Sequence, residues 1–186
     1  MTARKERPEE ALCSSGWDLS FLGMASAANA DQPHFAPQSR TFDLNYRWRK
    51  VRTQITRRRW HLERQEKPWR NLIRKSGFMD TFEGLGGVMV KPRFFDAEVF
   101  DIPDVLWAVD DIWLSGMTTK NGHRPWAVAQ ASRFTYTTTR EVDALNTSVI
   151  DGADRHAANR ACARYMKNKY HIWGGPDAEQ AERSAA

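Results

Sequence analysis

The stretch at residues 81–126, TFEGLGGVMVKPRFFDAEVFDIPDVLWAVDDIWLSGMTTKNGHRPW, carries the two motifs that decide the expected fold. The first is Gly84-Leu85-Gly86-Gly87, which runs into the apolar residues Val88-Met89-Val90. Adjacent glycines let the backbone turn tightly, or let a ligand approach where a Cβ would block it. The pattern predicts a strand over residues 88–91 after either a plain tight turn or a ligand-facing loop.

The second motif is Val109-Asp110-Asp111-Ile112-Trp113, where two carboxylates stand side by side at the start of a predicted helix over residues 110–120. Trp113, Leu114 and Met117 give that helix an apolar stripe, and Asn121-Gly122 is a typical helix end. Adjacent side chains on a helix point in different directions, so only one carboxylate can face a given reactant. The alternative is that both acids serve the helix N-terminus as cap and dipole partner.

In this order, the motifs resemble the second half of the catalytic domain in GT-A-type bacterial glycosyltransferases close to family 2. The similarity covers residues 77–173. It is carried by Gly86-Gly87-Val88, Phe94-Phe95-Asp96, Asp110-Asp111-Ile112-Trp113 and the ending Arg164-Tyr165-Met166-Lys167-Asn168-Lys169-Tyr170-His171-Ile172-Trp173.

The resemblance implies an α/β fold with a small mixed sheet and flanking helices, as a partial, truncated GT-A-like nucleotide-diphospho-sugar transferase fold. It implies transfer of a sugar from a nucleotide-sugar donor to a glycan acceptor, with Mn²⁺ or Mg²⁺ as cofactor. By the match, Asp111 would be the catalytic base and Asp110 would position it or contact the acceptor. Gly86, Gly87 and Trp113 would line the acceptor, although a Trp at this helix position also suits a core. His171 would join the metal site, although a lone His is more often a surface residue.

The sequence departs from the family's pattern in its first half. It contains no Asp-x-Asp motif and no Gly-rich phosphate loop. A truncated or frameshifted gene product that keeps the acceptor-side half, and is inactive alone, would explain this. The alternative function is a non-catalytic binding module or remnant that uses its arginine-rich segment to bind an anionic membrane or RNA.

Charge is concentrated in one segment of the chain. Residues 40–75 hold thirteen Lys and Arg against three acids, a net charge of +10, so the remainder of the +5 chain is −5. Trp48, Val51, Ile55 and Leu62 recur there at helical spacing, which predicts an amphipathic helix within residues 41–75. Pro68 either ends this helix or starts the next segment. The arginines from Arg47 to Arg64 suit a solvated surface, an anionic membrane or phosphate-bearing partner, or, least favoured, nucleic acid.

The outer parts of the chain show weaker patterns. We expect residues 1–38 to be disordered or loosely packed, although the apolar patch at 17–22 could form a short docking strand, and residues 176–186 to be a disordered tail. The GT-A-like domain would then span residues 39–175. Within it, a strand is expected over 125–131, extended by the Ser/Thr run at 132–139 or followed by a flexible loop there. A final helix over 155–170 would be capped by Asp151 or Asp154.

Cysteine usage and hydropathy indicate the compartment. Cys13 and Cys162 lack metal-ligand spacing and are expected to be free thiols in a reducing environment. The sequence has no apolar run long enough to span a bilayer. We therefore expect a cytoplasmic protein, peripheral at the inner membrane if the basic segment binds lipid.

Overall fold

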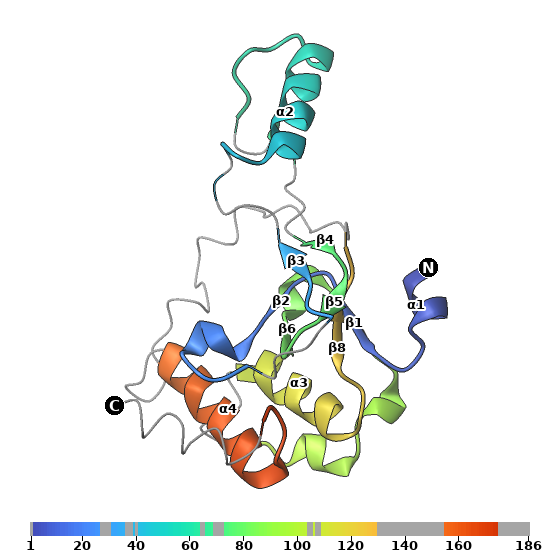
Figure 1. The fold of residues 1–186 in the computed structure, drawn as a ribbon, viewed down its shortest axis with the longest axis vertical. Helices are drawn as coiled ribbons and strands as arrows, with labels where there is room; N and C mark the ends of the chain where they lie inside the picture. The colour runs from blue at the N-terminus through green and yellow to red at the C-terminus, as the bar shows by residue number, and fades with distance from the viewer. Residues whose placement is uncertain are drawn as a thin grey trace.

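The computed structural model describes residues 2–26, 31–35, 39, 41–63, 66–68, 73–103, 106, 109–129 and 155–174. Three small sheets lie beside the helices, and helices α3 and α4 lie together on one side of the main sheet (Figure 1). The predicted α/β class is therefore confirmed at this level. Among the helices of these ranges, none is long and apolar enough to cross a membrane.

The main sheet has four strands in the order β5 (Gly77–Phe78), β8 (Pro125–Ala127), β1 (Ala11–Cys13) and β7 (Val88–Met89). Strand β1 pairs parallel with β8 and antiparallel with β7, and β5 pairs antiparallel with β8. All three residues of β1 are buried, as expected for a strand that has partners on both edges. Strand β7 is shorter than the strand predicted over residues 88–91, and β8 is shorter than the one predicted over 125–131. The Ser/Thr run at 132–139 lies outside the described residues.

Residues 11–24 of the N-terminal segment are part of the folded core, so the prediction of loose packing is wrong for them. After α1 (Thr2–Glu6), the chain supplies β1, then β2 (Gly16–Trp17), which pairs with β6 (Thr81–Phe82). The 3₁₀ helix η1 (Leu19–Leu22) buries Leu19 and Leu22, so the patch expected to dock as a strand docks mainly as a helical turn. These elements have two to five residues each, too short to show periodicity, and distant partners stabilise them.

Helices α3 (Asp110–Lys120) and α4 (Arg155–Tyr170) have the predicted bounds. Gly122 follows α3 with φ 83°, the left-handed conformation expected of a helix end. Gly116 of α3 packs closely against α4, because an added Cβ would lie 2.8 Å from Met166 Sδ and would require that side chain to move. The two helices and η1 form the larger apolar cluster, and the proposed caps Asp151 and Asp154 lie outside the described residues.

A second, smaller apolar cluster lies under the sheets. It contains Ala11, Cys13, Ile73, Met79, Phe82 and Ala127. Leu114 of α3 packs against both clusters. The short 3₁₀ helices η4 (Pro92–Phe94) and η5 (Ala97–Phe100) connect the main sheet to α3.

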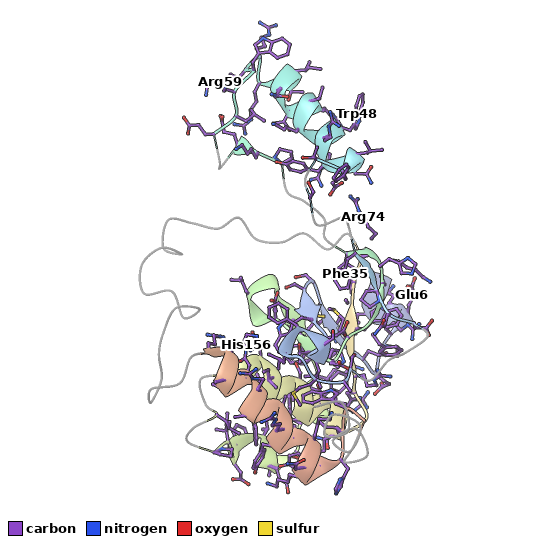
Figure 2. The ribbon with its side chains drawn as sticks, turned by 60° about the vertical axis from the view of Figure 1, so that its left-hand side comes forward. Glu6, Phe35, Trp48, Arg59, Arg74 and His156 are labelled. Carbon is purple, nitrogen blue, oxygen red and sulfur yellow. The ribbon has the colours of Figure 1, made fainter. Side chains whose placement is uncertain are left out.

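Helix α2 (Leu44–Thr56) projects away from the sheets and from the other helices (Figures 1 and 2). It ends well before Pro68, and Arg58 takes φ 51°. At this turn, Arg57 and Arg59 form ion pairs with Glu66 at 2.9 and 3.4 Å. Near its base, β3 (His34–Phe35) pairs with β4 (Ile73–Lys75).

Candidate functional site

The start of α3 faces the glycine loop, which forms the short 3₁₀ helix η3 (Gly84–Gly86). The Gly84 N–H donates to Asp111 Oδ1 at 2.8 Å. The N-cap position of α3 is Val109, whose apolar side chain cannot cap a helix. Neither acid is therefore the cap, and the Asp111 carboxylate is turned toward a different segment of the chain.

Ser115 fixes α3 to the strand that precedes the glycine loop. Its hydroxyl donates to the Asp111 carbonyl at 2.6 Å and accepts from the Phe82 N–H at 2.9 Å. Ser115 is fully buried, and Phe82 ends strand β6. Hydrogen bonds on two successive turns of α3 therefore set the position of Asp111 relative to the loop: one joins Asp111 to Gly84, and the other joins Ser115 to Phe82.

Gly86 and Gly87 each have a structural reason to be glycine. A Cβ on Gly86 would lie 2.3 Å from Ser14 Oγ and 2.3 Å from Ser15 Oγ. Gly87 has φ 90°, which side chains rarely adopt. The acceptor-lining role implied by the resemblance is not needed to explain either glycine, and the plain tight turn accounts for both.

The surroundings of Asp111 favour its protonated form. Burial raises its pKa, the Gly84 N–H opposes this by bonding the carboxylate, and the negative charges of Asp110 and Glu83 raise the pKa further. The Arg155 charge, at the start of α4, lowers it. A half-buried carboxylate with a raised pKa is a candidate for proton transfer, because a base works best when its pKa lies closer to the working pH.

A second pair of carboxylates, not anticipated as a pair from the sequence, lies at the end of the β2–β6 ribbon. Buried Asp80 accepts hydrogen bonds from the Leu19 N–H at 3.0 Å and from Ser26 Oγ at 2.7 Å. Asp18 accepts from the Asp80 N–H at 3.3 Å, and burial, followed by the Asp80 charge, raises the pKa of Asp18. These bonds hold η1 against the ribbon, which gives the pair a structural role.

Aromatic rings gather where η1 meets the start of α4. The Phe21 ring lies 5.9 Å from the Trp17 ring and stacks on the His156 ring at 5.9 Å. Phe21 is 69% exposed, and His156 follows Arg155, the residue whose charge acts on Asp111 (Figure 2). Exposed aromatic faces suit contact with sugar rings. The sequence signal for these residues was the apolar patch at 17–22, which does not by itself indicate a binding surface.

Trp113 does not lie where the acceptor-binding role requires. It is 2% exposed and packs in the core, and its indole N–H donates to the Val99 carbonyl at 2.9 Å. A buried indole has no face open to a sugar. The core-packing alternative accounts for its placement.

His171 lies at the other end of α4 from Arg155. Sixteen helical residues span about 24 Å at ~1.5 Å per residue. His171 is exposed, with φ 53°, and its N–H caps α4 by donating to the Lys167 carbonyl at 3.0 Å. The structure therefore does not bring His171 to Asp111.

A metal site is not assembled within the described part of the chain, where no three His, Cys, Asp or Glu side chains are grouped to hold an ion. The residues there do not fit the Mn²⁺ or Mg²⁺ that the resemblance implies.

Comparison with known proteins leaves the geometry as the main guide to function. No family model matches the chain, and neither a curated protein nor a solved structure matches it.

Proposed function

We propose that this chain is a GT-A-like glycosyltransferase domain, similar over residues 77–173 to the acceptor-side half of that family, with Asp111 as the base that activates the acceptor hydroxyl. The donor would be a nucleotide sugar and the acceptor a glycan. The proposal rests on the resemblance of residues 77–173 to that family and on the geometry of the start of α3.

The reaction requires one proton acceptor at the attacking hydroxyl. Asp111 would take the hydroxyl proton as the oxygen forms its bond to the anomeric carbon of the donor sugar. The bond from that carbon to the nucleoside diphosphate breaks, and the diphosphate leaves with the electron pair. Burial, followed by charge repulsion from Asp110 and Glu83, would disfavour the Asp111 carboxylate, which makes Asp111 a better base than an ordinary surface aspartate.

The single observation that carries the proposal is the orientation of Asp111. An acid that only stabilised its own helix would bond the free N–H groups of that helix. Asp111 instead bonds the N–H of Gly84 across the junction between two segments. One of its carboxylate oxygens is thus fixed, and the group stays half-buried beside two further acids.

The test measures nucleoside diphosphate release from UDP- and GDP-sugars in the presence of glycan acceptors. We expect Asp111→Asn to lower the rate at least 100-fold, the usual scale for losing a general base. The variant should keep an unfolding temperature equal to or above that of the unchanged protein at pH 7. Asp101→Asn, at an exposed position after η5, is the matched control and should keep full activity.

Undiminished turnover in Asp111→Asn would exclude Asp111 as the base. Loss of turnover together with a large loss of stability would show that Asp111 acts only in folding. If neither the unchanged chain nor its variants turn over any donor, the result would favour the second candidate function.

That second candidate is a non-catalytic binding module. The observation in its favour is helix α2, which carries exposed apolar and basic side chains away from the acids of α3. Thermal melts distinguish the two candidates. A nucleotide present at ~100 times its Kd adds about 2.7 kcal/mol to folding, which raises the unfolding temperature by several degrees. UDP or GDP should produce this shift if a donor site exists and leave a pure binding module unchanged.

A further inference from the structure

Helix α2 lies on an arm, residues 41–63, that is fixed to the domain at its base. Asp43, 1% exposed, begins α2 by accepting a hydrogen bond from the Tyr46 N–H at 3.0 Å, and it forms an ion pair with Arg74 of β4. Figure 2 shows Arg74 at the base of the arm, with Trp48 and Arg59 farther out. The arm is therefore anchored at one end, and the rest of α2 projects away from the domain.

Helix α2 presents an apolar stripe to solvent, made of Leu44, Trp48, Val51 and Ile55. Spacings of four, three and four residues place these side chains on one face of the helix. Each of them is between 44% and 74% exposed. Phe42 before the helix and Trp60 after it are 75% and 88% exposed. Six large apolar side chains thus lie open on one small element.

The chain's own packing uses the opposite face of the helix. Tyr46 lies two residues from Leu44 and from Trp48, which is about 200° around an α-helix, and it is only 8% exposed. Leu62, on the segment that returns from the tip, is likewise 8% exposed. The apolar stripe is therefore not the face that folding covers.

The charges around the apolar stripe are all positive. Residues 44–59 contain seven Lys and Arg and no Asp or Glu. Arg47 and Arg52 border the stripe on its two sides, four residues from Val51 and Trp48 respectively. Glu66 neutralises part of the charge at the tip through its ion pairs with Arg57 and Arg59. The arginines and the lysine of the helix itself are therefore positioned to bind an external anion.

We propose that the arm docks on the surface of a bilayer that contains anionic lipids, with the apolar stripe inserted among the upper acyl chains. Arg47 and Arg52 would meet phosphate headgroups on either side. A helix with an aliphatic face, a Trp and a basic border is the pattern of interfacial helices. The 13 residues of α2 are about 20 Å long, which suits a helix that lies in the interface and is too short to span the ~30 Å hydrocarbon core.

The composition of the stripe favours lipid over RNA. Single-stranded RNA is bound by stacking bases on aromatic rings, with cations along the backbone. Three of the four stripe residues, Leu44, Val51 and Ile55, are aliphatic and offer no such platform. Acyl chains accept aliphatic side chains, Trp suits the headgroup level of the interface, and the basic border then selects anionic headgroups.

The first experiment measures co-sedimentation of the full chain with vesicles of phosphatidylcholine alone or with 30 mol% phosphatidylglycerol. We expect binding only to the anionic vesicles, weakened at least tenfold between 50 and 500 mM NaCl. Val51→Ser/Ile55→Ser and Arg47→Gln/Arg52→Gln should each weaken binding at least tenfold. Both pairs are solvent-exposed, so the unfolding temperature should not change.

Matched controls use the same substitutions elsewhere on the surface. Leu85→Ser/Phe100→Ser removes two exposed apolar side chains, and Arg160→Gln/Arg164→Gln removes two exposed charges of α4. Both control variants should bind anionic vesicles as the unchanged chain does. Equal loss in the arm variants and the controls would overturn the proposal, since it would show general hydrophobicity or net charge to be sufficient.

The second experiment reports insertion directly. Cys13 and Cys162 are buried, so a thiol introduced by Ile55→Cys can be labelled selectively with an environment-sensitive fluorophore. Nitroxide lipids in anionic vesicles should quench the label at position 55 and leave a label at Phe100→Cys unaffected. Absence of quenching at 55 in vesicles that sediment the protein would contradict insertion of the apolar stripe.

Other occupants of the stripe would give distinct results that exclude the proposal. Binding of a uridine 20-mer with no binding to anionic vesicles would assign the arm to RNA. A dimer at micromolar concentration that Val51→Ser/Ile55→Ser converts to monomer, again without vesicle binding, would assign the stripe to a second copy. The proposal is independent of sugar transfer, because none of these measurements requires turnover.

Discussion

Gly86 of the glycine loop has little room for a side chain. An added Cβ would lie 2.3 Å from each of the hydroxyl oxygens of Ser14 and Ser15, far inside van der Waals contact. We expect Gly86→Ala to lower the free energy of unfolding by about 1–3 kcal/mol, the usual cost of overpacking. Urea denaturation measures the loss. Gly122→Ala is the comparison: its site has open space around it but φ 83°, so its cost is conformational alone.

The raised pKa of Asp111 predicts a pH-dependent effect on stability. Because burial raises this pKa in the folded state, the unfolded chain releases the proton more readily, and stability falls as pH rises from about 3.9 through the folded pKa. Asp111→Asn removes that cost. Its unfolding temperature, relative to that of the unchanged protein, should therefore increase from pH 3.5 to pH 7. A flat or falling difference for Asp111→Asn would contradict the assignment.

For single residues, the sequence indicates which side chains matter better than it indicates where the fold places them. The pair Asp110-Asp111 predicts a helix start with only one acid turned to a partner, and the structure turns Asp111 to Gly84. The apolar spacing that predicts α3 could not show whether Trp113 faces a ligand or the core. Periodicity identifies the buried side of an element, whereas the bond from Trp113 to Val99 depends on a loop elsewhere in the sequence.

At the scale of elements, one hydroxyl joins α3 to β6. Ser115 Oγ accepts from the Phe82 N–H, and both residues are buried. Ser115→Ala would leave that amide without its partner, at a cost of about 1–3 kcal/mol. Hydrogen exchange should show faster exchange of the Phe82 amide. Thr118→Val removes another buried hydroxyl of α3, which donates to the Ser115 carbonyl, and should be milder because no buried donor loses its acceptor.

Helices α3 and α4 could be predicted because each has more than ten residues of periodic apolar spacing and a clear stop or start. Among the strands, β7 and β8 were predicted but too long, and the others were missed because each has only two or three residues and its burial depends on partners far along the chain. Helix α2 was found but predicted too long. Leu62 fits the helical spacing, yet Arg58 takes a left-handed conformation just past the helix end, which hydrophobic periodicity does not indicate.

At the scale of the whole molecule, two apolar clusters share one side chain. Cys162 belongs to the cluster of α3 and α4, Cys13 belongs to the cluster under the sheets, and Leu114 packs against both. Burial raises the pKa of each thiol to about 12, so both should resist labelling at pH 8 until the chain unfolds. We expect both to become reactive at the same urea concentration, measured by mass spectrometry of the labelled peptides.

Separate midpoints for the two thiols would show that the clusters unfold independently. Leu114→Ala tests the link between them, since it removes the side chain that contacts both. The variant should either lower both midpoints together or separate them, whereas unchanged midpoints would show that Leu114 does not couple the clusters.

The parallel pairing of β1 with β8 has a consequence for the order of events during protein synthesis. Residue 11 of β1 lies opposite residue 125 of β8, which is 114 positions later in the chain. At roughly 5–20 residues per second, β1 therefore waits roughly 6–23 seconds on the ribosome before its parallel partner is made. Until then Ala11, Leu12 and Cys13 lack their parallel partner, and they directly follow residues 4–10, of which all but Pro8 are charged. Those charges flank the waiting strand as gatekeepers against aggregation of the nascent chain.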